Sequence, residues 1–217
     1  MLKKIALGLL MTSVVLVAVA DPAVPPVGGL PSLPKFGLPS FGKSGGVPPE
    51  KLVIEYLAGS KKIMEAQSRI LLALGNKDLA DLAAANASNM KEGATTDAIK
   101  GAQQVQTDSS AAIQLALTND SLQLDAAAKK EIAQGYVDLG LGTISYILFV
   151  KDAKNYSPSI TNINGSVAIL ALVVPRIPAD VGNLVKTFSA ISKFSSNNHI
   201  DLPKNSEDPT KSLASLL

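Results

Sequence analysis

The sequence predicts an all-α fold, a bundle of five to six helices with central apolar helices, preceded by a disordered Pro/Gly-rich arm. Beyond residue 49, apolar residues recur at steps of three, four and seven positions, which is the period of one helix face. Aromatic residues make up 4% of the chain and tryptophan is absent. The core must therefore consist of Ala, Leu, Ile and Val, which suits closely packed helices better than sheets. Strict apolar/polar alternation is absent beyond residue 20; residues 144–150 could form a strand, but their helical context favours a helix.

The N-terminus has the pattern of an export signal. Two lysines at positions 3 and 4 precede a nearly unbroken apolar run over residues 5–19, and Ala18-Val19-Ala20 gives the small-x-small motif that a signal peptidase reads. A membrane anchor is the alternative, but the run is short for a span of about 20 residues. We therefore expect cleavage after Ala20 and a periplasmic or secreted protein.

Residues 21–49 are expected to form a linker. They hold eight of the 13 prolines and six of the 16 glycines of the chain, a composition that supports neither a helix nor a strand ladder. An imperfect repeat, Gly-Leu-Pro-Ser followed by Leu or Phe, occupies residues 29–33 and 37–41. We favour a semi-rigid tether; a polyproline-type docking segment is the alternative.

The first three helices follow from apolar spacing and end signals. The first is expected over residues 50–74, because two prolines precede it, a glutamate stands in its first turn and a Gly-Asn pair follows it. A short second helix, residues 77–90, ends before a Glu-Gly pair. The third runs from about residue 95 to 117 and has a narrow face of small side chains, so another helix can approach it closely.

The later helices differ in polarity. The longest is expected over residues 122–156, after a cap signal at 119–121, and it ends at a Ser-Pro pair. A fifth helix over 160–174 and an amphipathic sixth over 179–194 flank a tight corner bracketed by two prolines. The predicted domain boundaries are 1–20 for the signal peptide, 21–49 for the linker, 50–196 for the bundle, and 197–217 for a polar tail with a short terminal helical turn at 213–217.

Two uncharged segments, residues 139–150 and 157–175, stand out in the middle of the chain. They are either central bundle helices enclosed by neighbours, the walls of an apolar pocket for a lipid or other hydrophobic ligand, or a hairpin that enters a membrane. A helix of 12 residues spans about 18 Å, less than the hydrocarbon core of about 30 Å. The lengths therefore favour the enclosed helices.

Composition excludes several functional classes. Removal of residues 1–20 takes away two of the 20 basic residues and none of the 18 acidic ones, so the mature chain has 18 of each and no net charge. Nucleic-acid binding, which needs clustered cations, is not expected. The absence of cysteine excludes disulfides, thiolate metal sites and lipid attachment at a lipoprotein cysteine.

Catalytic signatures are weak. His199, the only histidine, lies in a polar loop sequence, and no G-x-S-x-G motif supports a Ser-His-Asp triad. Asp78 and Asp81 share a helix face, but a solvated face explains them better than an acid pair does. No metal site, cofactor or catalytic residue is predicted.

The function predicted from these observations is non-catalytic. We expect an exported protein of the cell envelope that binds a hydrophobic small molecule, a lipid or a partner protein. The large side chains expected to line a ligand site are Tyr136, Tyr146, Phe149 and Phe188. The alternatives are a hydrolase that uses carboxylates with His199, and a membrane-inserting helical protein, which the segment lengths disfavour.

Overall fold

The structure, a computed structural model, describes residues 47–119, 122–156, 165–202 and 209–214, and it confirms the all-α bundle. The described part contains α1 (Pro49–Ala73), α2 (Lys77–Asn89), α3 (Thr96–Ala116), α4 (Ala126–Ala153), α5 (Gly165–Val173), α6 (Ile177–Asn197) and α7 (Pro209–Ala214). No strand occurs in these residues. The predicted signal peptide and nearly all of the predicted linker lie outside the described residues.

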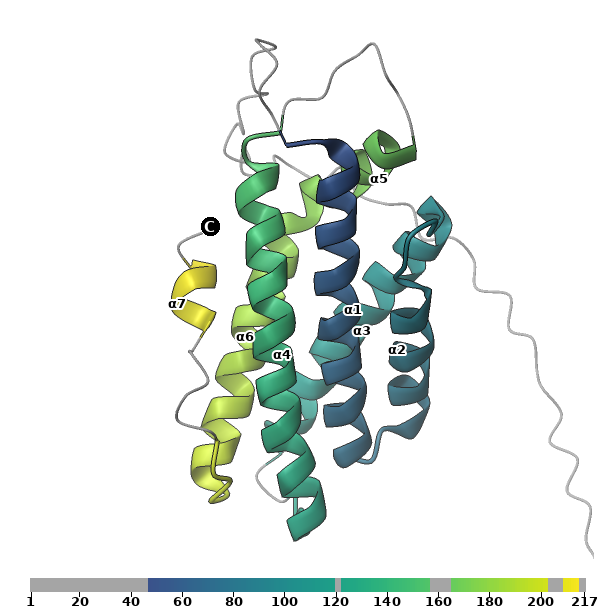
Figure 1. The fold of residues 1–217 in the computed structure, drawn as a ribbon. Coiled ribbons are helices and arrows are strands. Elements are labelled where there is room, and N and C mark those ends of the chain that lie inside the picture. The colour runs from purple at the N-terminus through teal and green to yellow at the C-terminus, as the bar shows by residue number, and fades with distance from the viewer. Residues whose placement is uncertain (1–46, 120–121, 157–164, 203–208, 215–217) are drawn as a thin grey trace, which may run out of the picture. The chain divides into compact units, whose positions relative to one another are not determined.

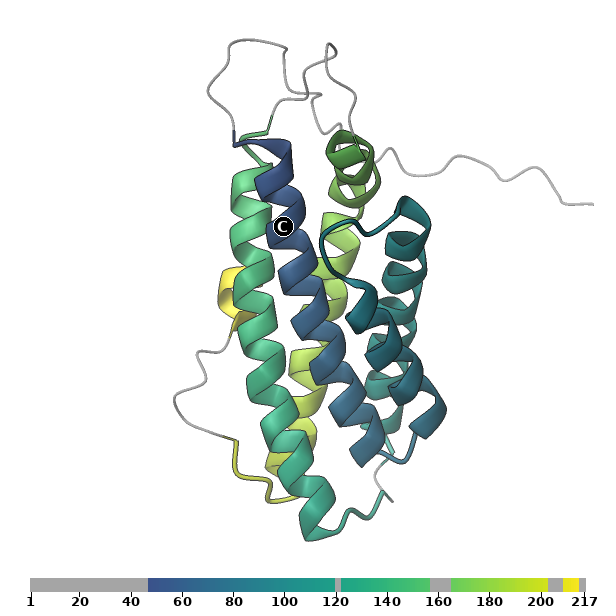
Figure 2. The same ribbon diagram turned by 45° about the vertical axis from the view of Figure 1, so that its right-hand side comes forward.

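Helices α1 and α4 pack side by side in opposite directions (Figures 1 and 2). Glycines make this approach close. A Cβ atom at Gly59 of α1 would lie 2.9 Å from the backbone nitrogen of Tyr146, and one at Gly142 of α4 would lie 2.8 Å from the backbone nitrogen of Ile63. Both distances are too short for carbon, so the α1–α4 contact requires glycine at these two positions.

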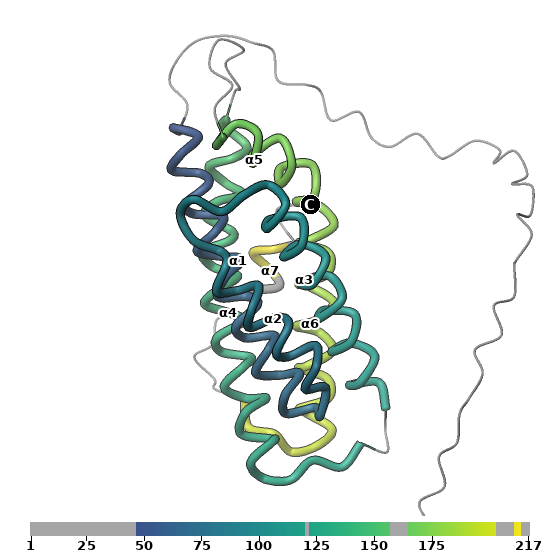
Figure 3. Tube along the Cα trace, turned by 90° about the vertical axis from the view of Figure 1, so that its right-hand side faces the viewer, coloured from purple at the N-terminus to yellow at the C-terminus, as the bar shows by residue number. Residues whose placement is uncertain are grey.

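The other helices are arranged around this pair. Helices α2 and α3 pack against α1, and Figure 3 shows them on the viewer's side of it. Helix α6 contacts both α3 and α4, α5 packs against α1 and α3, and the short α7 contacts α6 and α4. The predicted tight corner is a single 3-10 turn, Val174–Arg176, which connects α5 to α6.

Side-chain caps fix the start of three helices. Asn76, Thr95 and Asp125 each accept a hydrogen bond from the backbone N–H three residues later. The cap of α4 corrects the predicted start at residue 122, because the Asp125 carboxylate accepts from Ala128 at 2.7 Å and the helix begins at Ala126. Leu122 and Leu124 instead precede the helix and pack, half-buried, against the core.

Two further helices are covered only in part by the described residues. Helix α5 occupies residues 165–173 of the expected 160–174, and residues 157–164 lie outside the described part. Helix α7 begins at Pro209, four residues before the expected turn at 213–217, of which residues 215–217 lie outside the described part; Leu213 is completely buried against the bundle. Leu213 and Ile200 are therefore buried core residues in a tail that the sequence predicted to be mostly polar.

The core is apolar with a polar seam between α1 and α3. The Gln67 side chain is fully buried and donates to the Ser110 hydroxyl at 2.8 Å and to the Gln106 carbonyl oxygen at 3.2 Å. A buried amide without partners would cost about 1–3 kcal/mol, so these bonds favour one register of α1 against α3.

Candidate functional site

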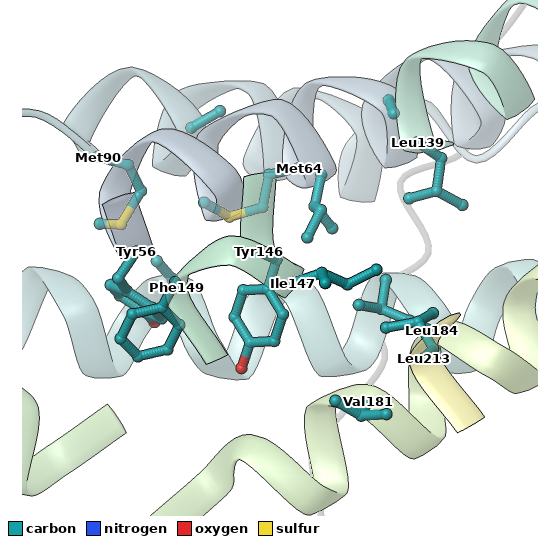
Figure 4. Close-up of a cluster of buried hydrophobic side chains, with 14 of the residues drawn as sticks. Tyr56, Met64, Met90, Leu139, Tyr146, Ile147, Phe149, Val181, Leu184 and Leu213 are labelled. Carbon is teal, nitrogen blue, oxygen red and sulfur yellow. The ribbon is translucent and has the colours of Figure 1, made fainter. Parts of the chain in front are cut away.

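The four side chains predicted to line a ligand site lie in the core, in two separate groups. Tyr146 and Phe149 of α4 pack with Tyr56 of α1, with ring centroids 5.4–6.4 Å apart (Figure 4). Tyr136 of α4 packs edge-on against Phe188 of α6, with centroids 5.4 Å apart and ring planes at 85°. Their role as ligand contacts stays a prediction; in this structure each packs against another aromatic ring.

Access to these rings is limited. Tyr146 and Phe149 have no exposed surface, and Phe188 is 1% exposed. Tyr136 and Phe188 border a solvent-open hollow of about 380 Å³, whose remaining lining is Ser189, Ser192, Lys193, Ser196 and Asn197 of α6. The volume suits a small molecule. Because the rings are almost entirely covered, the surface offered to a hydrophobic ligand there is mainly polar.

A second hollow of about 400 Å³ lies between the α1–α2 turn and the end of α3. It is lined by Leu71, Leu74, Gly75, Asn76, Lys77, Asp78, Ala112 and Ala116. Lys77 forms an ion pair with Asp81 of its own helix, and Asn76 caps α2. These polar side chains therefore have structural partners, and none of them points to a ligand.

Within the part of the chain that the structure describes, the buried acidic residue is Asp180, and its carboxylate links three helices. Asp180 of α6 is 7% exposed, and the Tyr146 hydroxyl donates to it at 3.1 Å. The Arg176 guanidinium lies 3.8 Å from the same carboxylate and donates to the Thr107 hydroxyl of α3 at 3.2 Å. Burial raises the pKa of Asp180 to about 6, although the Arg176 charge and the Tyr146 hydrogen bond act in the opposite direction.

Burial also keeps the hydroxyl groups of Tyr56 and Tyr146 protonated. Burial raises the pKa of Tyr56 to about 12, and burial raises the pKa of Tyr146 well above its ordinary value. A general acid or base works best with a pKa near the operating pH and within reach of a substrate. The pKa of Asp180 is near the operating pH, but the side chain is buried among protein groups, which argues for a structural role.

His199 ends helix α6. Its φ angle is +53°, the left-handed conformation, and the Ile200 N–H bonds to the Ser195 carbonyl oxygen at 2.9 Å in the pattern of a Schellman cap. The predicted loop position thus has a defined backbone role. No interaction that would support catalysis is seen at His199 among the described residues.

The acidic side chains singled out in the sequence lie on exposed helix faces. Asp81 pairs with Lys77, and Asp78 is exposed in the first turn of α2. Within the described ranges, no group of three or more His, Asp or Glu side chains could hold a metal ion. The geometry of these residues is that of solvated helix faces.

The outward face of α4 is the most unusual surface of the bundle. Leu141, Ile144 and Leu148 are 54%, 41% and 55% exposed, although large apolar residues are usually buried. Val137, half-buried and outside the core cluster, continues the line by one turn. We call these four residues the α4 row. In Figure 1 α4 stands at the front of the bundle, and no other described helix covers it.

The α4 row corrects the sequence interpretation of this segment. Residues 139–150 were expected to be enclosed by neighbours because they carry no charge. The structure encloses one side, through Leu139, Tyr146 and Phe149, and leaves the opposite side open. Absence of charge cannot distinguish a buried face from a docking face, but the spacing of the α4 row, with steps of four, three and four, could have been noticed.

The described residues include one stretch with membrane-spanning potential. One helical stretch, Gly165–Asn197, is long and apolar enough to cross a bilayer on length and composition alone, and a third of its most apolar window is buried in the bundle. It joins α5 to the amphipathic α6, whose apolar side chains pack into the core. A single such stretch is weak evidence, because core helices of soluble proteins meet the same criterion.

Comparison of the chain with models of protein families, with curated proteins and with solved structures found no match. The chemistry of the protein's own surface is therefore what points to its function.

Proposed function

We propose that this chain is an exported, non-catalytic protein of the cell envelope that binds a partner protein through the α4 row. The exposed α4 row is the single observation that supports this proposal most. An isolated exposed leucine needs no explanation, but apolar residues that repeat along one outward face are typical of a protein interface. The heptad-like spacing indicates that the partner contributes a helix with an apolar face.

The surroundings of the α4 row favour a protein over a lipid surface. Lys51 with Asp152 and Arg69 with Asp138 form ion pairs between α1 and α4 at 2.9 and 3.2 Å, along one flank of the row. On that flank these pairs leave no net positive charge to attract anionic lipid head groups, and the exposed lysines of the same face, Lys130 and Lys151, stand only beyond the two ends of the row. A polar rim around an apolar centre is the common composition of a protein–protein interface.

The test is photo-crosslinking in cells that make the protein. A photoreactive residue at Ile144 is expected to capture a protein, whereas the same residue at Leu82 of α2, an exposed leucine outside the row, is not. The captured band should disappear when Leu148→Glu is added, because a buried charge opposes docking. Equal labelling at both positions, or none at Ile144, contradicts the proposal.

The proposed export is tested by determining the N-terminal residue of the protein. The protein isolated from the envelope or medium is expected to begin at Asp21, which terminal sequencing or intact mass determines directly. An intact N-terminus on protein found in the cytoplasm contradicts this part of the proposal.

A small-molecule site is the second candidate. The hollow beside Tyr136 and Phe188 carries one cation, Lys193, and three serines, which fits an amphiphile with an anionic head better than a pure hydrocarbon. Native mass spectrometry after gentle purification is the measurement, and a Lys193→Glu variant should lose any bound mass. A bare protein mass in both forms contradicts this candidate.

A further inference from the structure

The α4 row belongs to a longer pattern along the outward face of α4. Gln134 precedes it by three residues, Lys130 by seven, and Lys151 follows it by three. All three are exposed. Spacing that alternates between three and four places the whole series on one stripe, as in the a and d positions of a coiled coil. The stripe has an apolar centre, about 16 Å long from Val137 to Leu148, and a polar residue at each end.

We propose that the partner that docks on the α4 row is a second copy of this chain, with the two α4 helices antiparallel. This inference rests on the proposed function and names its partner. In the antiparallel register that places each a position opposite a d position, Leu141 of one copy faces Ile144 of the other. Val137 then faces Leu148, and Lys151 faces Gln134.

The stripe is therefore complementary to itself. Eight apolar side chains, four from each copy, meet in the centre, and both ends close with a lysine beside an amide. Each contact occurs twice, as the twofold symmetry of a homodimer requires. A surface that served an unrelated helix would not need this agreement between its two ends.

Charge selects the antiparallel direction. In a parallel pair, Lys130 would face Lys130 and Lys151 would face Lys151, so like charges would meet at both ends. In the antiparallel register Lys130 is offset by one turn, about 6 Å along the axis, from Lys151 of the other copy, so no two lysines stand directly opposite each other. The carboxylates on the α1 side do not oppose it, because Asp138 and Asp152 are paired with Arg69 and Lys51 of their own copy.

The size of the contact surface indicates how tightly the two copies should associate. One helix pair buries less than the roughly 1,600 Å² of a standard stable interface. The association is therefore expected to be reversible, with a Kd on the order of micromolar to sub-millimolar.

The first test is sedimentation velocity of the purified full chain over a series from about 10 μM to about 1 mM. The average mass should rise from monomer toward dimer. Leu148→Glu should weaken the association at least ten-fold, whereas Leu82→Glu, the same change at a similarly exposed leucine of α2, should leave it unchanged. Helical circular dichroism of both variants shows that they are folded. A monomer throughout the series, or equal loss in both variants, overturns the proposal.

The second test measures the register. The chain has no cysteine, so Val137→Cys and Leu148→Cys each introduce one thiol. Oxidation of a mixture should give the Val137–Leu148 hetero-crosslink, whereas either variant alone should give little, because its thiols lie about 16 Å apart along the axis. Efficient crosslinking of Leu148→Cys with itself would indicate parallel pairing and overturn the proposal.

The two proposals can fail separately. Capture of a different protein at Ile144 in cells, together with a monomer in solution, overturns self-association and leaves the binding function standing. Capture of a band at twice the mass of the chain supports both. Absence of any capture and of any self-association overturns both.

Discussion

Single glycines determine how closely the two long helices approach. Three glycines occur within eight residues of α4, at 135, 140 and 142, and each lowers the intrinsic stability of the helix by about 1 kcal/mol relative to alanine. The structure explains Gly142, whose missing side chain makes room for the backbone of Ile63. It does not require Gly140, because a Cβ there would meet no atom within 4 Å.

These two glycines make a matched pair. Gly142→Ala should destabilise the protein by about 1–3 kcal/mol, because the helices must separate to admit one methyl group. Gly140→Ala should be neutral or stabilise by up to about 1 kcal/mol through helix propensity alone. Urea unfolding followed by circular dichroism measures both. Equal effects at the two positions would contradict the packing described for α1 and α4.

His199 provides a second test at the scale of one residue. A non-glycine residue in the left-handed region is strained by about 1 kcal/mol, so His199→Gly should raise the stability by about 0.5–1 kcal/mol. His199→Ala should bring no such gain, because alanine disfavours the same φ angle. Thermal melting of both variants is the measurement. Equal stabilisation by glycine and alanine would show that the imidazole, rather than the backbone, is responsible.

At the scale of a helix, the start of α4 depends on one carboxylate. Asp125→Ala removes the acceptor for the Ala128 N–H and should cost about 1 kcal/mol. Gln123→Ala, an exposed change two residues earlier, should alter the stability by less than about 0.5 kcal/mol. Chemical denaturation of the two variants compares them. A larger loss at Gln123 would restore the earlier start that the sequence suggested.

The sequence predicted most helices to within a few residues because its end signals act locally. Gly75, Thr95 and Asn76 adopt the cap or turn positions that their residue types favour. The start of α4 was misplaced because several consecutive candidates for a cap, from Asn119 to Asp125, are equally good in isolation. Only the packing of Leu122 and Leu124 against the core selects among them.

The candidate site was less predictable than the fold. Tyr136, Tyr146, Phe149 and Phe188 were chosen for their size, and size directs a side chain to the core as readily as to a ligand. The α4 row was missed for a related reason: the uncharged segment 139–150 has no charged side chain to mark which side of the helix meets solvent. That information lies in the neighbouring helices, because α1, α6 and α7 cover only part of α4.

At the scale of the whole molecule, the buried Asp180 connects the helices. Tyr146 of α4 donates to its carboxylate, and Arg176 of the turn before α6 lies beside it and extends the contact to α3. Tyr56 of α1 packs against the ring of Tyr146. The interaction therefore reports on the assembled bundle rather than on any one helix. Its effect on stability follows from the raised pKa.

The sign of that effect is determined by which state binds the proton more tightly. The folded protein holds the Asp180 proton up to a pH of about 6, whereas the ordinary value for this group is 3.8. Protonation thus stabilises the fold fully below about pH 4, and this contribution disappears as the pH rises through 6. The difference corresponds to stabilisation on the order of 3 kcal/mol.

Asp180→Asn should remove this part of the pH dependence, because the amide stays neutral and can still accept from Tyr146. The difference in unfolding free energy between the wild type and Asp180→Asn should therefore change between pH 4 and pH 7, because the wild type loses stability relative to the variant as the pH rises.

Tyr146→Phe should strengthen the pH dependence of stability instead of removing it. Loss of the donor raises the pKa of Asp180 further, so the decline in stability extends to higher pH. Urea titrations at several pH values measure all three proteins. The same pH dependence of the unfolding free energy in the wild type and in Asp180→Asn would contradict this prediction. It would mean that the carboxylate is hydrated in solution and that α4 and α6 are less closely packed there than in the structure.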